Sequence, residues 1–451
     1  MNSIKKERQQ IFNDVYSNII PKRVPIDISF SLEVVAGYAG LNVKDVLWNP
    51  TLIESTVMEL AQKVFSDTCI LGGIPRIPSS TQAMGSINSV MSSKGFMQHP
   101  NVVGLLEDEY DMFIEDPYAC IIETILPRLY KEMNISIYGP RSLFAALQGM
   151  NAKNEFLSKF ETVRGKLIQK FGYYERPRGA SSGVYACMDF LSDNIRSFTG
   201  ICLDIKKRPE KILAANEALY PYNYKVGLPT VIHREGEVFI PLHMPPFMRE
   251  KDFEKLWWPT FKRQLVDYAS LGIHTRIFCE GNWMRYLEYL QDLPSNTRIQ
   301  FEYGDPKTIK RKLGNKFILI GLFPISILTH FSKQQCIDET KKFLDIMAPG
   351  GNYIFTFDKI PLTYSDINLE NLIAVSETVR EYGVYDNAGQ KAGSQFNKND
   401  YKHSNSPPFT SKYYRTWEEY KKLFPETPDS ARTIVENLEN DILKFVYKLL
   451  L

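Results

Sequence analysis

Amphipathic segments alternate with short apolar runs between residues 252 and 385, which is the pattern of parallel β/α units. The apolar runs predict four buried strands, at residues 275–278, 297–301, 316–322 and 352–357. The amphipathic segments predict helices at residues 254–271, 284–293, from Pro306 onward, 325–347 and 368–382.

The spacing of these strands favours a TIM-like (β/α)₈ barrel over an open α/β sheet. Successive strands follow one another at roughly twenty to forty residues, and no glycine-rich dinucleotide turn follows any of them. Upstream, residues 200–205 and 238–242 predict two further strands, with a helix at residues 209–219 between them. About six strands of the barrel can therefore be named.

The chain divides into three predicted regions. Residues 1–150 are richer in helical patterns, so we expect a helical cap and entry segment there. Residues 151–390 hold the β/α pattern and form the expected barrel. Residues 391–451 begin with a polar stretch and end in an amphipathic one, which predicts an exposed linker and a C-terminal helix over residues 428–451.

Carboxylates end three of the predicted strands, namely Glu280, Glu302 and Asp358. The carboxyl ends of barrel strands converge on one face, where functional residues gather. A carboxylate there either meets a cation or acquires a raised pKa, so metal ligation and acid/base catalysis are the functional readings. A salt bridge or a helix N-cap is the alternative for each residue. His243 follows another predicted strand and precedes two prolines, which makes it a candidate ligand or proton carrier.

The neighbours of these residues extend the candidate site. Cys279 adjoins Glu280, and strand alternation turns only one of the two side chains toward the barrel mouth. Four residues close to the strand ends are candidates for substrate binding, although core packing explains aromatic residues there equally well: Trp283, Tyr303, Asp305 and Phe357.

Overall charge and composition argue against nucleic-acid binding and against a membrane-spanning segment. Among 451 residues, 54 Lys and Arg stand against 52 Asp and Glu, so the net charge of +2 gives no electrostatic reason to expect nucleic-acid binding. The longest apolar stretch is short and contains Pro324, so no membrane span is expected. The six cysteines are scattered without a CxxC pair, which is typical of free thiols in a cytoplasmic protein.

Several segments together carry a resemblance to a known family. They are PLH at 241–243, FEKLWWPTFK at 253–262, FCEGNW at 278–283, FEYGDPKTIKRKLG at 301–314 and APGGNYIFTFDKIPLT at 348–363. On these segments the chain resembles the uroporphyrinogen decarboxylase superfamily, in its branch of cobalamin-dependent methyltransferases. The resemblance covers most of residues 1–385 and leaves out the tail after residue 390.

The resemblance implies a TIM-like barrel with a zinc ion that activates the methyl donor or acceptor, and a corrinoid protein as partner. That branch typically offers a His-x-Cys pair before Gly-Asn and a second Cys after a Gly-Gly strand. Here Phe278 stands at the histidine position, Glu280 at the first cysteine and Asp358 near the second, while Glu302 falls where the branch also supplies a glutamate. A set of harder oxygen ligands would favour polarising an ether or phenolate oxygen over activating a thiol.

The resulting expectation is a cytoplasmic methyltransferase that moves a methyl group from a small methoxy compound to a corrinoid protein. His243, Glu280, Glu302 and Asp358 are the expected ligands of zinc or another divalent ion, with His243 and Glu280 as catalytic residues. The alternatives are a decarboxylase or lyase that uses the same residues as proton carriers, and a non-catalytic small-molecule binding protein. Porphyrinogen decarboxylation itself is not expected, because no arginine-rich segment with a catalytic aspartate is found around residues 23–90.

Overall fold

The computed structural model describes residues 3–73 and 76–451. Its centre is a parallel sheet of six strands that pair in sequence order, so each connection passes to the neighbouring strand. This mixed α/β arrangement follows the predicted alternation. The strands are β3 (Ser181–Gly183), β4 (Glu237–Leu242), β5 (Thr275–Asn282), β6 (Thr297–Tyr303), β7 (Ile318–Gly321) and β8 (Tyr353–Ile354).

Isolated parallel bridges continue the pairing beyond β8. Ile26 pairs with Phe355, Phe30 with Leu71, and Thr68 with Tyr174, which lies shortly before β3 in the chain. The segments around residues 26–30 and 68–71 therefore run parallel to the sheet, although the predicted boundary places them in the N-terminal cap.

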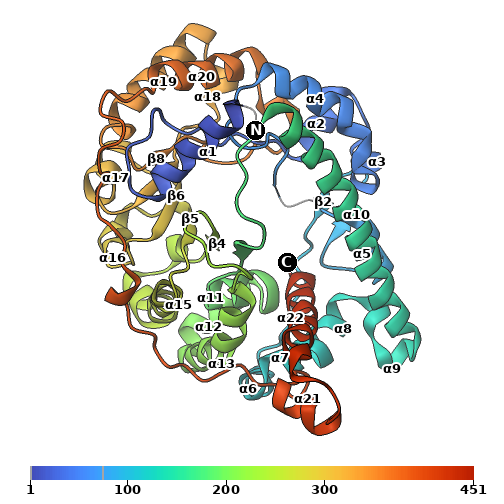
Figure 1. Ribbon diagram of the computed structural model, residues 1–451. Helices are drawn as coiled ribbons and strands as arrows, with labels where there is room; N and C mark the ends of the chain where they lie inside the picture. The colour runs from blue at the N-terminus through green and yellow to red at the C-terminus, as the bar shows by residue number, and fades with distance from the viewer. Residues whose placement is uncertain (1–2, 74–75) are drawn as a thin grey trace.

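Helices cover the outer side of β4 to β8, and α10 lies on the other side of the molecule (Figure 1). The longer helices from α10 onward are α10 (Arg141–Phe171), α12 (Phe198–Lys207), α13 (Pro209–Gly227), α15 (Trp258–Ser270), α17 (Pro306–Leu313), α19 (Lys333–Met347), α20 (Leu369–Tyr382) and α22 (Arg432–Leu449). The N-terminal part contributes α1 (Ser3–Tyr16), α2 (Leu32–Ala39), α3 (Val43–Trp48), α4 (Glu54–Lys63), α5 (Pro78–Ala83) and a small hairpin of β1 (Val90–Met91) and β2 (Met97–Gln98). Within residues 3–73 and 76–451, no helix is long and apolar enough to cross a membrane.

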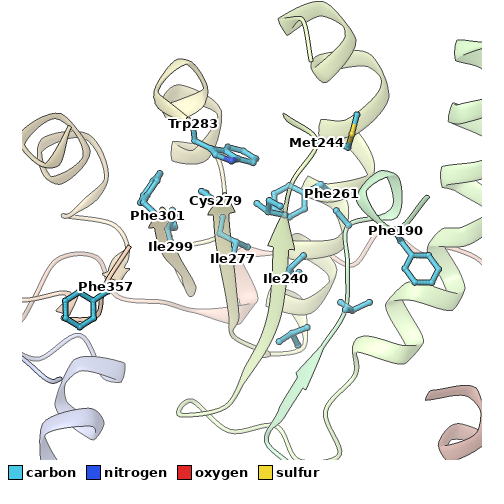
Figure 2. Packing of buried hydrophobic residues seen from close by; sticks show 14 of the residues in the cluster. Phe190, Ile240, Met244, Phe261, Ile277, Cys279, Trp283, Ile299, Phe301 and Phe357 are labelled. Atoms are coloured by element: carbon cyan, nitrogen blue, oxygen red, sulfur yellow. The ribbon is translucent and has the colours of Figure 1, made fainter. Parts of the chain in front are cut away.

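The main core lies between the sheet and its outer helices. Ile240, Ile277 and Ile299 are register partners on β4, β5 and β6, and Figure 2 shows them in a row. Cys279 and Phe301 continue the same face one pleat further along, and all five side chains are almost completely buried. Because strand side chains alternate, the residues between them point to the opposite face of the sheet.

Two predicted elements are wrong. Residues 200–205 are not a strand but the centre of α12, where Gly200, Ile201 and Asp204 are buried at helical spacing. The predicted single helix over residues 325–347 is two helices, because Ser332 caps a new helix, α19, after the short α18 (Ile327–His330). The other strands and helices of the β/α region lie where the sequence predicts them, with shifted ends.

The tail packs closely against the rest of the chain. Ser404 donates a hydrogen bond to Asp267 of α15, and α22 places the Tyr447 ring against Phe190 at 4.4 Å between ring centroids. At the other predicted boundary, residue 150 lies inside α10, so this helix runs through the proposed division between cap and barrel.

Candidate functional site

His243 lies directly after β4 and is held between two carboxylates from different elements. Its Nδ1 is 2.5 Å from Asp193 Oδ2, and its Nε2 is 2.5 Å from Glu280 Oε2 at the end of β5. Both ring nitrogens face an acceptor, so the imidazole carries two protons in this arrangement. The histidine side chain is 36% exposed, so the group lies at the surface end of the sheet and is open to a ligand.

Asp189 fixes the backbone that carries this histidine. The carboxylate is completely buried, and its Oδ1 accepts hydrogen bonds of 2.7 Å from the N–H groups of both His243 and Met244. Its Oδ2 accepts a third bond, 2.5 Å long, from Nε1 of Trp257. Because three buried donors depend on one side chain, Asp189 sets where His243 leaves the strand.

Two π-helical segments position side chains of this site. The segment Leu191–Ile195 follows α11 (Cys187–Phe190) and carries Asp193, and the segment Phe253–Trp257 carries Trp257. A π-turn inserts one extra residue into a helix, which changes the direction of the following side chains and recurs at functional sites. One segment thus supplies Asp193, which contacts His243, and the other supplies Trp257, which binds the Asp189 that holds the His243 backbone.

The electrostatics of the group favour a charged histidine. Burial lowers the pKa of His243, but the hydrogen bonds and charges of Asp193 and Glu280 outweigh this effect and raise the pKa to about 11. For Asp189, burial and the nearby charge of Asp193 raise the pKa to about 7, while its three N–H donors oppose the change. The site therefore holds an imidazolium ion at neutral pH.

Strand alternation separates Glu280 from its neighbour as predicted. Cys279 is fully buried in the core of Figure 2, whereas Glu280 points the other way to His243. Gly281 follows with φ of +70° in a bulge between β5 and β6, a conformation that glycine adopts without strain. Its N–H donates a 2.7 Å hydrogen bond to Oε2 of Glu302, which ties the ends of the two strands together.

The two remaining predicted ligands are engaged elsewhere. Glu302 lies 3.7 Å from the Lys359 ammonium. Asp358 accepts hydrogen bonds from the backbone N–H groups of Ile325 and Lys359, and burial raises its pKa. Both carboxylates thus bind backbone donors near the strand ends, and the structure gives neither a contact with His243.

The candidate substrate-binding residues differ in their surroundings. Trp283 is fully buried and donates to the backbone oxygen of Glu280, and Phe357 packs against Phe323 and Phe355. Tyr303 is 59% exposed at the end of β6. Asp305 accepts a 2.8 Å bond from the N–H of Thr308 and is the N-cap of α17.

Replacing Asp305 with Ala should affect stability more than activity. The variant loses the N-cap of a short helix, α17, so we expect a fall in Tm of no more than about 2 °C. Turnover should match that of the parent protein. Thermal unfolding and initial rates measure the two effects, and a large rise in KM would instead assign Asp305 to substrate binding.

The observed geometry does not fit zinc. Two ligands of one tetrahedral zinc lie roughly 3.3 Å apart, because each metal–ligand bond is about 2.0–2.2 Å. The contacts of His243 with its carboxylates are 2.5 Å, which leaves room for a proton and not for an ion. Across the described ranges, no group of three or more His, Cys, Asp or Glu side chains is arranged to hold a metal.

Two central residues of this site were not predicted from the sequence. Asp189 and Asp193 lie in the segment CMDFLSDN, whose apolar pattern indicates an ordinary buried helix. The available signal was the pair of carboxylates four residues apart in this segment, directly before the turn to α12.

Comparisons with known proteins find similarity among solved structures. No protein-family model matches the chain, and no curated protein matches it. Among solved structures, a methyltransferase from Methanosarcina mazei is similar, with a TM-score of 0.52 and 14% sequence identity, over 85% of this chain and 99% of that one. At this identity the match establishes a shared fold, to which the His243 site adds its own chemistry.

Proposed function

We propose that this protein is a methyltransferase that takes a methyl group from a small methoxy compound and passes it to a corrinoid protein. The observation that carries the proposal is the imidazolium of His243 held between Asp193 and Glu280. The fold shared with a methyltransferase and the resemblance in residues 241–363 support the choice of reaction. The free state of the six cysteines in the structure suits a reducing cytoplasm.

We further propose that the sheet closes into a TIM-like barrel. The parallel bridges from Phe355 through Ile26, Phe30, Leu71 and Thr68 to Tyr174 support this arrangement, because they lead from one edge of the six-stranded sheet back toward β3. In such a barrel the ends of β4 and β5 face the mouth, where substrates bind.

The proposed chemistry requires a proton at the departing oxygen. When the bond between the methyl carbon and oxygen breaks, its electron pair stays on the oxygen, which must be neutralised. The Glu280 carboxylate accepts the proton from Nε2 of His243 and passes that same proton to the departing oxygen, so His243 ends neutral, Glu280 is again a carboxylate, and the product is an alcohol or phenol. Asp193 holds the imidazole through Nδ1 during the transfer and stabilises its charged form.

The methyl group itself needs an acceptor with a free electron pair. A reduced corrinoid on a partner protein supplies this nucleophile, and it is a second substrate in the proposal. The remaining contribution of this chain is to orient the methoxy group beside Glu280 and to keep the proton source charged. The proposal routes no step through zinc, because the described residues contain no group of three or more His, Cys, Asp or Glu side chains that could hold a metal.

A proton-transferring lyase or decarboxylase is the second candidate. The same doubly paired histidine favours it, since an imidazolium next to a carboxylate also protonates a carbanion left by loss of carbon dioxide. The two candidates differ in their products: a methylated corrinoid and an alcohol in one case, carbon dioxide in the other.

The experiment incubates the protein with ¹³C-methoxy aromatic compounds and reduced cobalamin, before and after removal of metal with a chelator. We expect label on the corrinoid and an equal amount of phenol, and the same rate after chelation, because the proton comes from His243 and Glu280. Metal analysis by mass spectrometry is the control. A rate that disappears with the metal and returns with zinc would restore the metal-assisted mechanism, whereas label released as carbon dioxide from carboxyl-labelled analogues would favour the lyase.

A further inference from the structure

Helix α22 carries apolar residues on two of its sides. One side packs against the rest of the chain and holds the buried residues Val435 and Tyr447. The other side presents Ile434, Leu438 and Ile442 at four-residue spacing, and these residues are 63%, 62% and 50% exposed. An ordinary surface helix has one apolar side and turns polar residues to the solvent, so this exposed α22 stripe is a candidate contact surface.

A second group of exposed apolar residues lies on α9 (Ile135–Tyr138) and on the start of α10. Its six members are between 38% and 72% exposed: Ile135, Ile137, Tyr138, Leu143, Phe144 and Leu147. This α9–α10 group neighbours the α22 stripe, because Nζ of Lys153 on α10 lies 5.6 Å from the ring centroid of Phe445 on α22. Phe445 comes seven residues after Leu438 and therefore lies on the same side of α22 as the stripe. Figure 1 shows α9, α10 and α22 together at the lower right of the molecule.

The nine exposed side chains of the α22 stripe and the α9–α10 group form a large apolar surface. At roughly 200 Å² for a fully exposed residue of this size, their exposed fractions leave on the order of 1,000 Å² open to solvent. The largest apolar patch of a typical monomer covers about 300–600 Å², whereas each partner in a standard protein interface contributes about 800 Å². The surface is thus as large as a stable interface between two chains requires.

The two parts of this surface carry charges of opposite sign. Residues 426–441, which include the α22 stripe, contain five carboxylates and one arginine. Residues 128–153, which include the α9–α10 group, contain four Lys or Arg residues and one carboxylate. The surface therefore has an acidic part on α22 and a basic part on α9 and α10.

Much of this charge is not neutralised within the chain. Ion pairs join Arg128 to Glu109, Arg141 to Glu132 and Arg432 to Glu436. Among the described residues, Lys131 and Lys153 of the basic part and Glu439 and Asp441 of the acidic part have no ion-pair partner. Burial and the charge of Lys448 lower the pKa of Lys153 to about 8, as expected for a cation without a carboxylate beside it.

We infer that this surface is the interface of a symmetric dimer, in which the α22 stripe of each copy packs against the α9–α10 group of the other. A two-fold axis requires a surface that is complementary to itself, and a surface with an acidic and a basic part meets this requirement. A lipid surface fits less well, because the carboxylates around the α22 stripe would face anionic headgroups. The dimer does not depend on the proposed methyl transfer.

Sedimentation equilibrium between about 0.1 and 100 µM protein tests this inference. We expect the parent protein to form dimers at the upper end of this range. Leu438→Lys and Phe144→Asp, one in each part of the surface, should each weaken the dimer about 100-fold or more, because each places a charge against the like-charged part of the partner at two symmetric positions. Both side chains are more than half exposed, so folding should survive, and thermal unfolding confirms it.

Leu203→Lys is the matched control, because Leu203 is a half-exposed leucine of α12, outside both groups. It should dimerise like the parent. Lys131→Glu should weaken the dimer about tenfold, because it turns a negative charge toward the acidic part of the partner. The inference is overturned if the parent is monomeric at about 100 µM, if Leu438→Lys or Phe144→Asp dimerises as tightly as the parent or no more weakly than Leu203→Lys, or if Lys131→Glu leaves the affinity unchanged.

Discussion

Replacement of His243 with Gln is expected to lower methyl transfer by about 100- to 10,000-fold, the usual contribution of a general acid. The amide cannot pass a proton to Glu280, although it has a similar size and retains hydrogen bonding. Single-turnover methylation of cobalamin measures the loss. Substrate affinity should change little, so the effect should appear in the rate of the chemical step.

The same variant should change the pH dependence of stability. The pKa of His243 is raised in the folded state from 6.5 to about 11, so its charged form contributes stability that is complete below pH 6.5. This contribution declines as the pH rises from 6.5 toward 11, and His243→Gln should lack that decline. His233→Gln is the control, because His233 precedes β4 at the other end of the sheet. Equal activity of the two variants would remove His243 from the mechanism.

Replacement of Asp189 with Ala is expected to be the most destabilising single change at the site. It leaves the N–H groups of His243 and Met244 and the indole N–H of Trp257 without their acceptor. Each unsatisfied buried donor costs about 1–3 kcal/mol, so we expect the free energy of unfolding to fall by about 3 kcal/mol or more. Denaturant titration measures the loss.

Asp193→Ala is the matched comparison for this prediction. Asp193 contacts the ring of His243 and the hydroxyl of Ser192, whereas the N–H groups of His243 and Met244 donate to Asp189. We therefore expect a smaller loss of stability but a similar loss of methyl transfer, because the imidazolium loses one of its two carboxylates. If both variants unfolded at the same denaturant concentration, Asp189 would not be the anchor of the strand end.

The sequence predicts the fold best between residues 252 and 385, where apolar strands and amphipathic helices alternate. Strands β4 to β7 carry buried apolar residues between helical segments, and the contact of His243 with Glu280 joins two of the four residues that were predicted at strand ends. Residues 200–205 show the limit of this reasoning, because a short apolar run fits a buried strand and a buried helix equally well. There the N-cap Ser197, whose side chain accepts from the N–H of Gly200, was the signal for a helix.

The position of Asp193 beside His243 does not follow from the helical or strand repeat of hydrophobic residues. Asp193 reaches His243 because of a π-turn, which breaks the helical repeat from which side-chain directions are read. Glu302 lies at the end of β6 and Asp358 follows β8, but the backbone N–H groups of Gly281 and Ile325 bind them. A shared position at strand ends therefore predicts which residues lie near one another, and not which of them share a ligand.

The protonation of His243 is the central claim, and ¹⁵N NMR of its imidazole ring across the pH range measures it most directly. The account predicts that both ring nitrogens stay protonated through neutral pH, with a midpoint well above the ordinary value of 6.5. Glu280→Gln should lower that midpoint, because one of the two stabilising carboxylates is lost. A midpoint at or below 6.5 in the parent protein would contradict the account, since His243 would then hold no proton to give at neutral pH.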